Sequence, residues 1–240
     1  MNLKKMRVLV TGGGSGIGEA LAITFARHGA SVIICGRNLE KLEMVRKEHS
    51  GIRAYKTDIT IHDQITTLKT RLDSEMDGID ILVNNAGRMV QFDIKHGIPK
   101  SASNEIELNF IAALNLIDLF LPQLMSRNQS AIINVSSGYA LAPARSAPVY
   151  CATKAALHSF TKSLRWQLED TPVKVIEIFP PVVATSAATV KGGVDPQVFA
   201  NIVVRQIEKS KTEIKVGQVM LLAITRHLAP GIIDMILKKR

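Results

Sequence analysis

The stretch VLVTGGGSGIGEA, residues 8–20, places five glycines directly after a short apolar run. Val8, Leu9 and Val10 have the composition of a buried β-strand, and the residues from Gly16 onward have the apolar spacing of a helix. Glycine has no Cβ, so a ligand can approach the backbone of such a turn closely. A helix that begins inside the turn presents free N–H groups and the positive end of its dipole. The stretch therefore predicts a strand–turn–helix unit that binds a pyrophosphate group.

Short β-branched segments alternate with amphipathic segments along the rest of the chain. We expect strands near 6–11, 31–36, 52–57, 79–84, 130–136, 173–179 and 213–219, and helices near 16–28, 39–49, 62–76, 101–127, 149–170 and 196–210. This alternation is typical of a parallel sheet with helices on both faces. The sequence therefore predicts an α/β fold with a doubly wound sheet of about seven strands, whose ligands bind beyond the carboxyl ends of the strands.

Composition narrows the class of protein. The chain has 240 residues, 46% of them apolar, and no linker-like stretch divides it, so we expect one domain over residues 1–240. We expect no signal peptide and no membrane-spanning helix. Cys35 and Cys151 have neither metal-ligand nor disulfide spacing, which suits a reducing cytoplasm. The net charge is +9, but the basic residues are scattered and aromatics are only 5%, which argues against nucleic-acid binding.

Two motifs resemble signatures of a known family. The spacing Gly-x-x-x-Gly-x-Gly in 11–18 resembles the fingerprint of the classical short-chain dehydrogenase/reductase family, and Asn84-Asn85-Ala86-Gly87 resembles its second signature. The resemblance covers about 6–185 and implies a Rossmann-type fold, a nicotinamide dinucleotide cofactor and oxidoreductase activity. The cofactor contacts that it implies in this chain are Gly12, Gly14, Ser15, Gly16, Ile17, Gly18, Arg37, Asp58, Ile59, Asn85, Ala86, Gly87, Tyr150, Lys154, Pro180, Val183 and Thr185.

The end of the second strand bears on the choice of cofactor. An NAD enzyme usually carries a carboxylate there, whereas this chain has Cys35-Gly36-Arg37-Asn38. Arg37 can meet a 2′-phosphate with charge-assisted hydrogen bonds, so we expect NADP(H). NAD(H) remains the alternative, with Arg37 stacked on adenine or simply solvated at the start of a helix. The resemblance gives Asp58 a hydrogen bond to the adenine amino group; a helix N-cap is the other interpretation.

Tyr150 and Lys154 lie four residues apart, so they share one face of the predicted helix. A tyrosine phenol titrates near pH 10, and a nearby ammonium group is expected to lower that pKa. Ser137, thirteen residues earlier, can hydrogen bond a substrate carbonyl. Tyr139 has no lysine four residues later, so we do not expect it to be the acid. The resemblance adds Asn109, which would hold a water linking Lys154 to solvent; a role in bending the helix is the alternative.

Two segments depart from the family or are not explained by it. Pro181 stands where the family normally has glycine, although Thr185 is in its usual place. We expect a substrate lid over about 182–195 with hinges at Gly192 and Gly193. The apolar C-terminal segment over about 221–240 ends in basic residues. Packing along the domain or at a subunit interface and a weak contact with an anionic membrane surface are both open.

These observations predict an NADP(H)-dependent reductase of carbonyl groups, or dehydrogenase of alcohols, that uses no metal. Tyr150 would be the general acid in reduction and the base in oxidation, assisted by Asn109, Ser137 and Lys154. From the family we expect a homodimer or homotetramer that takes a small-molecule substrate. The alternatives are an NAD(H)-dependent dehydrogenase of the same fold and a non-catalytic dinucleotide-binding redox sensor.

Overall fold

A single seven-stranded sheet organises the protein, whose computed structural model describes residues 1–183 and 193–238. The strand order is β3-β2-β1-β4-β5-β6-β7 and every pairing is parallel. The order reverses between β1 and β4, which confirms the predicted doubly wound α/β fold. The strands are β1 Arg7–Thr11, β2 Ser31–Gly36, β3 Ile52–Lys56, β4 Ile81–Asn84, β5 Ser130–Val135, β6 Val173–Phe179 and β7 Glu213–Lys215.

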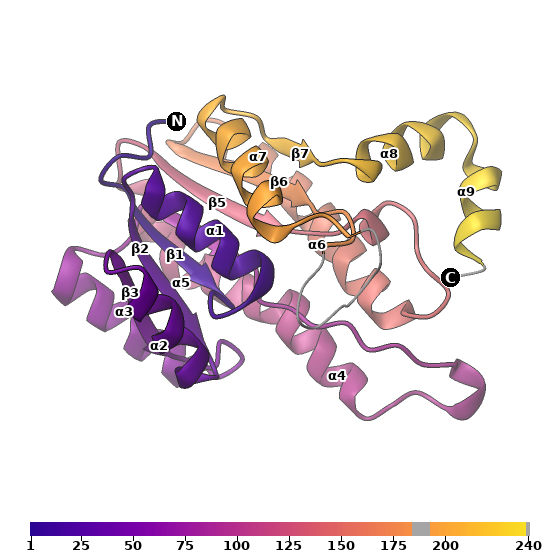
Figure 1. The fold of residues 1–240 in the computed structure, drawn as a ribbon, viewed down its shortest axis with the longest axis horizontal. Coiled ribbons are helices and arrows are strands. Elements are labelled where there is room, and N and C mark those ends of the chain that lie inside the picture. Colours follow the sequence, from indigo (N-terminus) through magenta and orange to yellow (C-terminus); the bar gives the residue numbers. More distant parts are fainter. Residues whose placement is uncertain (184–192, 239–240) are drawn as a thin grey trace.

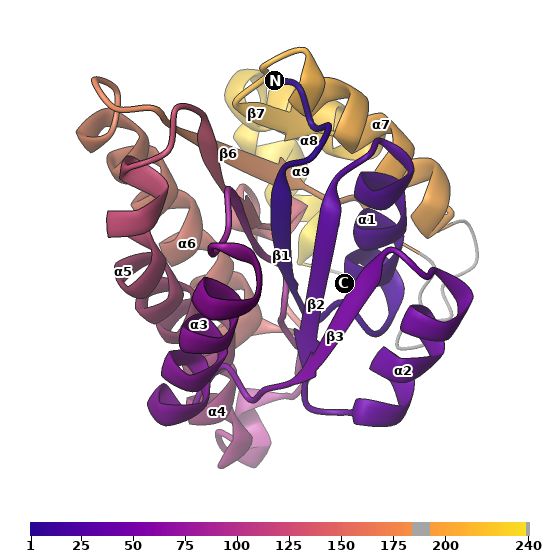
Figure 2. The ribbon, with the colours of Figure 1, turned by 90° about the vertical axis from the view of Figure 1, so that its left-hand side faces the viewer.

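Helices cover both faces of the sheet, as Figure 2 shows. On one face lie α1 (Gly16–Arg27), α2 (Leu39–Glu48) and α7 (Pro196–Glu208). On the other lie α3 (His62–Met76), α5 (Ala112–Met125) and α6 (Pro148–Gln167). The central strands are buried on both sides, which explains why they read as continuous β-branched runs instead of alternating ones. Each helix layer therefore has its own apolar core against the sheet.

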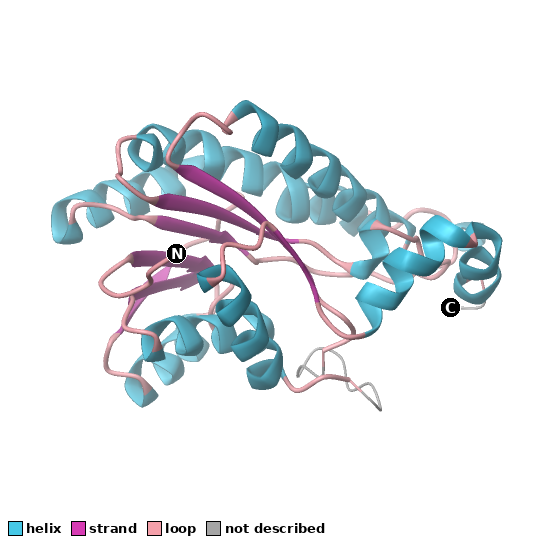
Figure 3. Cartoon of the chain, turned by 90° about the horizontal axis from the view of Figure 1, so that it is seen from above, coloured by secondary structure: helices cyan, strands magenta, loops and turns pink. Residues whose placement is uncertain are grey.

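Three further helices gather at the carboxyl edge of the sheet, far from the N-terminus (Figures 1 and 3). These are α4 (Ser101–Ile106), α8 (Gln218–Leu228) and α9 (Pro230–Leu237). Short 3₁₀ turns over Ile94–His96 (η1) and Gly138–Ala140 (η3) lie in the loops that follow β4 and β5. The loops and helices that surround the predicted site are thus collected at one edge.

Two predicted elements differ from the structure. The strand expected over 213–219 ends at Lys215, because β7 is an edge strand that pairs with only three residues of β6, and Gly217, at φ +59°, turns the chain into α8. The helix expected over 101–127 is α4, a π-helical stretch over Glu107–Ile111 (η2) and α5. By length and composition Ser101–Met125 is sufficient to cross a membrane, contrary to our expectation. In the fold, however, the inner face of α5 packs against the sheet.

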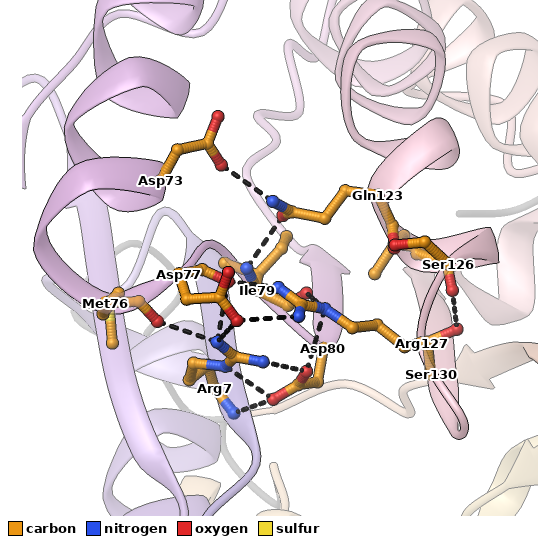
Figure 4. Close-up of polar contacts among 11 residues, drawn as sticks. Arg7, Asp73, Met76, Asp77, Ile79, Asp80, Gln123, Ser126, Arg127 and Ser130 are labelled. Carbon is orange, nitrogen blue, oxygen red and sulfur yellow. Dashed lines mark hydrogen bonds and ion pairs between the residues drawn. The ribbon is translucent and has the colours of Figure 1, made fainter.

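The amino ends of the central strands are joined by a network of paired charges, drawn in Figure 4. Arg7 in β1 binds both carboxylate oxygens of Asp80, at 2.9 and 2.7 Å. Arg7 and Arg127 both contact Asp77, and the Gln123 side chain accepts a hydrogen bond from the Ile79 backbone. The network links β1, the start of β4 and the end of α5 at the edge opposite the predicted site.

Candidate functional site

The glycine turn after β1 has the backbone shape that its sequence predicts. Gly12 and Gly16 have φ values of +66° and +59°, a region that side chains disfavour. A Cβ on Gly12 would lie 3.0 Å from the Cα of Ala86, and one on Gly18 would lie 2.3 Å from the carbonyl oxygen of Gly12. Gly18 is therefore needed for close packing of α1 against the turn, whereas Gly12 keeps the turn close to the loop after β4.

The N-terminus of α1 is left open at this turn. Ser15 is the N-cap, but its side chain makes no capping hydrogen bond. Gly14, Ser15, Gly16 and Ile17 are at least partly accessible to solvent. Free N–H groups and the helix dipole together favour an anion at such a position. The open N-terminus of α1, bordered by glycines, fits the pyrophosphate of a dinucleotide.

Thr11 fastens the glycine turn to the loop after β4, a role that the sequence analysis did not assign. Its hydroxyl accepts hydrogen bonds from the backbone N–H groups of Asn85 and Ala86, each at 3.0 Å. The Asn85 amide donates to the Thr11 carbonyl at 2.9 Å. The signal in the sequence for this role of Thr11 was a hydroxyl side chain at the last position of a buried strand. The glycine turn after β1 and the loop after β4, both predicted to bind cofactor, are therefore held side by side by these hydrogen bonds.

Arg37 is exposed directly after β2, on the strand next to the glycine turn. Within 1–183 and 193–238 its guanidinium has no hydrogen bond or ion pair, so it is available to a ligand. The side chain of the next residue, Asn38, caps α2 by accepting from the Lys41 N–H at 3.0 Å. The Lys41 Cβ would lie 3.3 Å from a Cβ placed on Gly14, so a second cation, not predicted from the sequence, flanks the same turn.

Asp58 follows β3 and shapes a local turn. Its Oδ1 accepts from the backbone N–H of Thr60 at 3.0 Å and from the Thr60 hydroxyl at 2.7 Å. The N-cap of α3 is Ile61, so the alternative interpretation of Asp58 as the cap of that helix is wrong. Ile59 is buried in the core beneath α3.

The predicted catalytic side chains meet at the carboxyl ends of β5 and β6. Lys154 is buried in α6, and its Nζ donates to the carbonyl oxygen of Val135 at 2.8 Å. The same Nζ lies 5.8 Å from the centroid of the Tyr150 ring. The Ser137 hydroxyl acts on the Tyr150 phenol through a hydrogen bond that lowers the phenol's pKa. The structure thus brings Ser137, Tyr150 and Lys154 together.

Tyr139, the competing tyrosine, lies in the 3₁₀ turn after β5. Its ring packs edge-on against that of Tyr150, with 6.4 Å between centroids. Its backbone N–H donates to the Ser137 hydroxyl at 3.1 Å. Tyr139 therefore supports the two groups that are predicted to touch substrate.

The pKa values at this site differ from the sequence-based expectation. Burial raises the pKa of Tyr150 to about 12 and outweighs the hydrogen bond from Ser137. Burial also lowers the pKa of Lys154 to about 8. The expectation that Lys154 brings the phenol below its ordinary pKa is therefore wrong for the protein alone, because desolvation disfavours both charged forms.

Asn109 occupies the π-helical stretch between α4 and α5 and is buried. Its amide donates to the Arg88 carbonyl at 2.8 Å and to the Thr153 hydroxyl at 3.2 Å, and accepts from the Arg88 N–H at 2.9 Å. A Cβ on Gly87 would lie 3.1 Å from the Asn109 Oδ1 and 3.6 Å from the Lys154 Nζ. Asn109 thus lies in an irregular helical turn and close to Lys154. Its position is compatible both with a role in bending the helix and with a water link to Lys154.

Two buried carboxyl groups near the site were missed from the sequence. Glu105 in α4 accepts a hydrogen bond from the Val90 N–H through Oε1 at 3.1 Å, while its Oε2 has no partner among the described residues. Glu177 lies in β6 and pairs with His158 of α6. Two features of the sequence could have indicated these carboxyl groups. Glu105 lies four residues before Asn109, and Glu177 stands inside the apolar run VKVIEIF.

The predicted lid is described only at its two ends. Pro180 is buried, Val183 forms a parallel bridge with Val194, and the Val194 N–H donates to the Val182 carbonyl at 3.0 Å. Of the predicted hinges, Gly193 is described. Thr185 and Gly192 lie outside the described residues.

The C-terminal helices pack beside the catalytic loop through one face. Val219 and Leu222 of α8 lie against Gly138, and Ile233 and Leu237 of α9 form a small apolar cluster with Ala142. Packing along the fold therefore accounts for the inner face of this segment. The outer face leaves large apolar side chains exposed: Met220, Leu221, Ile224, Leu228, Met235 and Ile236.

Other features of the described residues do not compete with this site. Open depressions of about 560 and 350 Å³ lie at the amino ends of the strands, lined by Arg7 and Arg53 in one case and Arg27 in the other. No cluster of three His, Cys, Asp or Glu side chains suited to a metal occurs in the described part of the chain. Cys35 and Cys151 are free and buried.

Comparison with known proteins agrees with this geometry. The family model described as short chain dehydrogenase matches residues 6–192. The uncharacterized oxidoreductase DltE of Bacillus subtilis is 43% identical over 187 residues, which cover 77% of this chain and 74% of that protein. The uncharacterized oxidoreductase MW2403 of Staphylococcus aureus is 33% identical, over 81% of this chain and 87% of its own.

Solved structures give the same result. A short chain dehydrogenase from Burkholderia cenocepacia in complex with NADP has a TM-score of 0.88 and 26% identity, over 99% of both chains. A short chain dehydrogenase/reductase from Burkholderia phymatum in complex with NAD also has a TM-score of 0.88, with 18% identity over 97% of this chain and 96% of that chain. The chain therefore belongs to the short-chain dehydrogenase/reductase family of oxidoreductases, with a Rossmann-type nucleotide-binding fold.

Proposed function

We propose that the protein is an NADP(H)-dependent oxidoreductase that interconverts a carbonyl group and an alcohol on a small-molecule substrate. One observation carries the proposal: Ser137, Tyr150 and Lys154 meet at the carboxyl edge of the sheet, beside a glycine turn with an open helix N-terminus. A protein that only senses a dinucleotide has no need for that group of side chains, which argues against the redox-sensor alternative.

The cofactor-binding residues lie along one edge. The turn from Gly12 to Gly18 and the N-terminus of α1 would hold the pyrophosphate. Asp58 and Ile59 would lie at the adenine, Asn85, Ala86 and Gly87 along the ribose and nicotinamide side, and Pro180, Val183 and Thr185 at the carboxamide. When bound, NADP(H) supplies or accepts the hydride at the substrate carbon.

The preference for NADP(H) rests on charge. The run Cys35-Gly36-Arg37-Asn38, which spans the end of β2 and the two residues after it, contains no carboxylate. Arg37 follows β2, and Lys41 lies beside Gly14 of the glycine turn. Arginine binds phosphate through paired charge-assisted hydrogen bonds. The Burkholderia cenocepacia neighbour was solved with NADP and the Burkholderia phymatum neighbour with NAD, so the family accommodates either cofactor.

The proton chemistry is assigned to Tyr150. In reduction Ser137 donates a hydrogen bond to the carbonyl oxygen, and Tyr150 transfers its phenolic proton to that oxygen as negative charge develops there. A phenol whose pKa is raised to about 12 is protonated at neutral pH and is ready to act as the acid. Lys154, beside Asn109 and Gly87, would stabilise the resulting phenolate, bind the nicotinamide ribose and pass a proton back toward solvent.

Assembly and location are further parts of the proposal. The chain would act as one domain and as a homodimer or homotetramer, with the exposed apolar side chains of α8 and α9 covered by a second copy. A weak contact of this face with an anionic membrane surface is the alternative, favoured by the basic residues at the end of the chain. Two free buried thiols suit the cytoplasm.

The decisive experiment is NADPH oxidation by the purified protein with a panel of ketones, aldehydes and quinones. Turnover that disappears in Tyr150→Phe supports the reductase and narrows its substrate class. NADPH binding without turnover on any member of the panel would favour the sensor, and turnover that persists in Tyr150→Phe would contradict the assigned mechanism.

A further inference from the structure

Glu177 places a carboxylate inside the central part of the fold. It lies in β6 and is fully buried, in a strand whose other buried residues are apolar. Its strand neighbour in β5 is Asn134, and the Asn134 amide donates to the Thr161 hydroxyl on α6. Residues in register on parallel strands point to the same face, so Glu177 also points toward α6. A buried carboxylate is costly unless it is paired or used.

His158 of α6 holds this carboxylate at both oxygens. Its Nδ1 lies 3.1 Å from Oε1 and 2.9 Å from Oε2. The imidazole ring also packs on the Phe179 ring, with centroids 5.4 Å apart. These contacts fix the rotamers of both partners, and the hydrogen bond to Glu177 raises the pKa of His158.

The helix links this pair to the catalytic group. Tyr150, Lys154 and His158 follow one another at intervals of four residues, so they form a single stripe along α6. The Lys154 ammonium is hydrogen bonded to a neutral acceptor, the Val135 carbonyl. Burial disfavours its charged form, and the negative charge of Glu177 opposes that effect. Val135, whose carbonyl accepts the Lys154 hydrogen bond, directly follows Asn134, the register partner of Glu177, so the strand pairing places Glu177 beside the end of the Lys154 side chain.

The other charged groups nearby act on the pair or on the tyrosine. Glu213 and Lys215 of β7 act on His158 with opposite signs, and Glu213 is also ion paired with Lys215 and Arg165. From α4, Glu105 acts on Tyr150. These contacts leave Glu177 as the carboxylate that acts on Lys154.

We propose that Glu177, held in place by His158, is a positioning residue that keeps the buried Lys154 ammonium charged. The proposal rests on the proposed function, since a charged Lys154 matters because it serves Tyr150 and the cofactor ribose. The contacts of Glu177 with His158 are compatible with two roles. In one, the ion pair only holds α6 against β6; in the other, which we propose, the Glu177 charge also sets the protonation of Lys154.

The test is a direct titration of Lys154 in the protein without cofactor. Lysines labelled with carbon-13 at Cε are followed by NMR across pH, and the Lys154 signal is assigned as the one lost in Lys154→Met. We expect a titration midpoint near pH 8, as burial implies. In Glu177→Gln, which keeps the shape and removes the charge, the midpoint falls by about one unit, because the ammonium loses its counter-charge.

Two variants distinguish charge from packing. Glu177→Asp keeps the charge and is expected to keep the midpoint close to that of the wild type. Glu213→Gln removes a carboxylate that acts on His158 but not on Lys154, so it is the matched control and leaves the midpoint unchanged. A folded Glu177→Gln protein with an unshifted Lys154 midpoint would overturn the proposal.

Folding and activity are kept apart from this result. If Glu177→Gln does not fold, the double variant Glu177→Gln/His158→Gln replaces the ion pair with two neutral amides and is compared with His158→Gln, which keeps the Glu177 carboxylate; a lower Lys154 midpoint in the double variant than in His158→Gln supports the proposal, and equal midpoints overturn it. In the active enzyme, the alkaline limb of kcat/KM should move to lower pH in Glu177→Gln. Absence of turnover in the wild type would remove the proposed function, while the NMR titration would still decide the role of Glu177.

Discussion

The two edges of the sheet treat polar groups in opposite ways. At the amino ends, Arg7, Asp80, Asp77 and Arg127 pair with one another (Figure 4). At the carboxyl ends, among the described residues, the Oδ1 of Asn84, the Oε2 of Glu105 and the Oγ of Ser136 are buried without a hydrogen-bond partner. Unpaired buried polar atoms cost stability and are uncommon in folded proteins. The contrast indicates that the amino edge is organised for stability and the carboxyl edge for binding and chemistry.

The largest expected effect is at the carboxyl edge. Tyr150→Phe should lower turnover with NADPH at least about a hundredfold, the lower range for loss of a general acid, while the fold is retained. Tyr139→Phe is the matched control, because its ring packs on Tyr150 but its hydroxyl has no assigned role. Initial rates of NADPH oxidation measure both. Equal losses in the two variants would show that loss of either hydroxyl disturbs the site and that the effect is not specific to the Tyr150 proton.

The amino edge should show the reverse behaviour. Asp80→Asn removes the carboxylate that binds Arg7 through both oxygens and leaves the exposed Asp77 as the remaining ion-pair partner of Arg7 among the described residues, so the free energy of unfolding should fall by about 2 kcal/mol while kcat stays near that of the wild type. Chemical denaturation gives the first quantity and steady-state kinetics the second. Asp77→Asn, at an exposed position of the same network, should change the denaturation midpoint much less. A large fall in kcat in Asp80→Asn would contradict the assignment of stability to the amino edge and of chemistry to the carboxyl edge.

Cofactor choice sharpens the account of the carboxyl edge. Arg37→Ser should raise the KM for NADPH about tenfold or more and leave that for NADH nearly unchanged, because it removes charge-assisted hydrogen bonds to the 2′-phosphate. Arg46→Ser is a suitable control, since Arg46 lies at the far end of α2 from Arg37 and is ion paired with Glu43. Comparable dissociation constants of the wild type for NADPH and NADH would contradict the NADP(H) assignment.

Local signals carried most of the prediction of this fold. The strand, glycine turn and helix over 8–27 were predictable because each residue's conformational preference agrees with the final structure there. The end of β7 was not, since an edge strand stops where its partner stops. The Tyr150 pKa was predicted in the wrong direction because burial depends on distant elements. Glu177 was missed because its partner His158 is nineteen residues away and on another element.

The smallest expected effect concerns Glu105, the buried carboxyl group next to the site. Burial raises its pKa, so the native state binds a proton that the unfolded chain releases at lower pH. The contribution of this group to stability is therefore greatest when it is protonated and declines as pH rises through the raised pKa. Glu105→Gln keeps an acceptor for the Val90 N–H and cannot ionise.

The stability of Glu105→Gln relative to the wild type should therefore increase from pH 5 to pH 8, which denaturation midpoints at the two values measure. A stability difference that is independent of pH would mean that Glu105 is solvated like an ordinary surface carboxylate. In that case the contrast between the two edges would rest on Asn84 and Ser136.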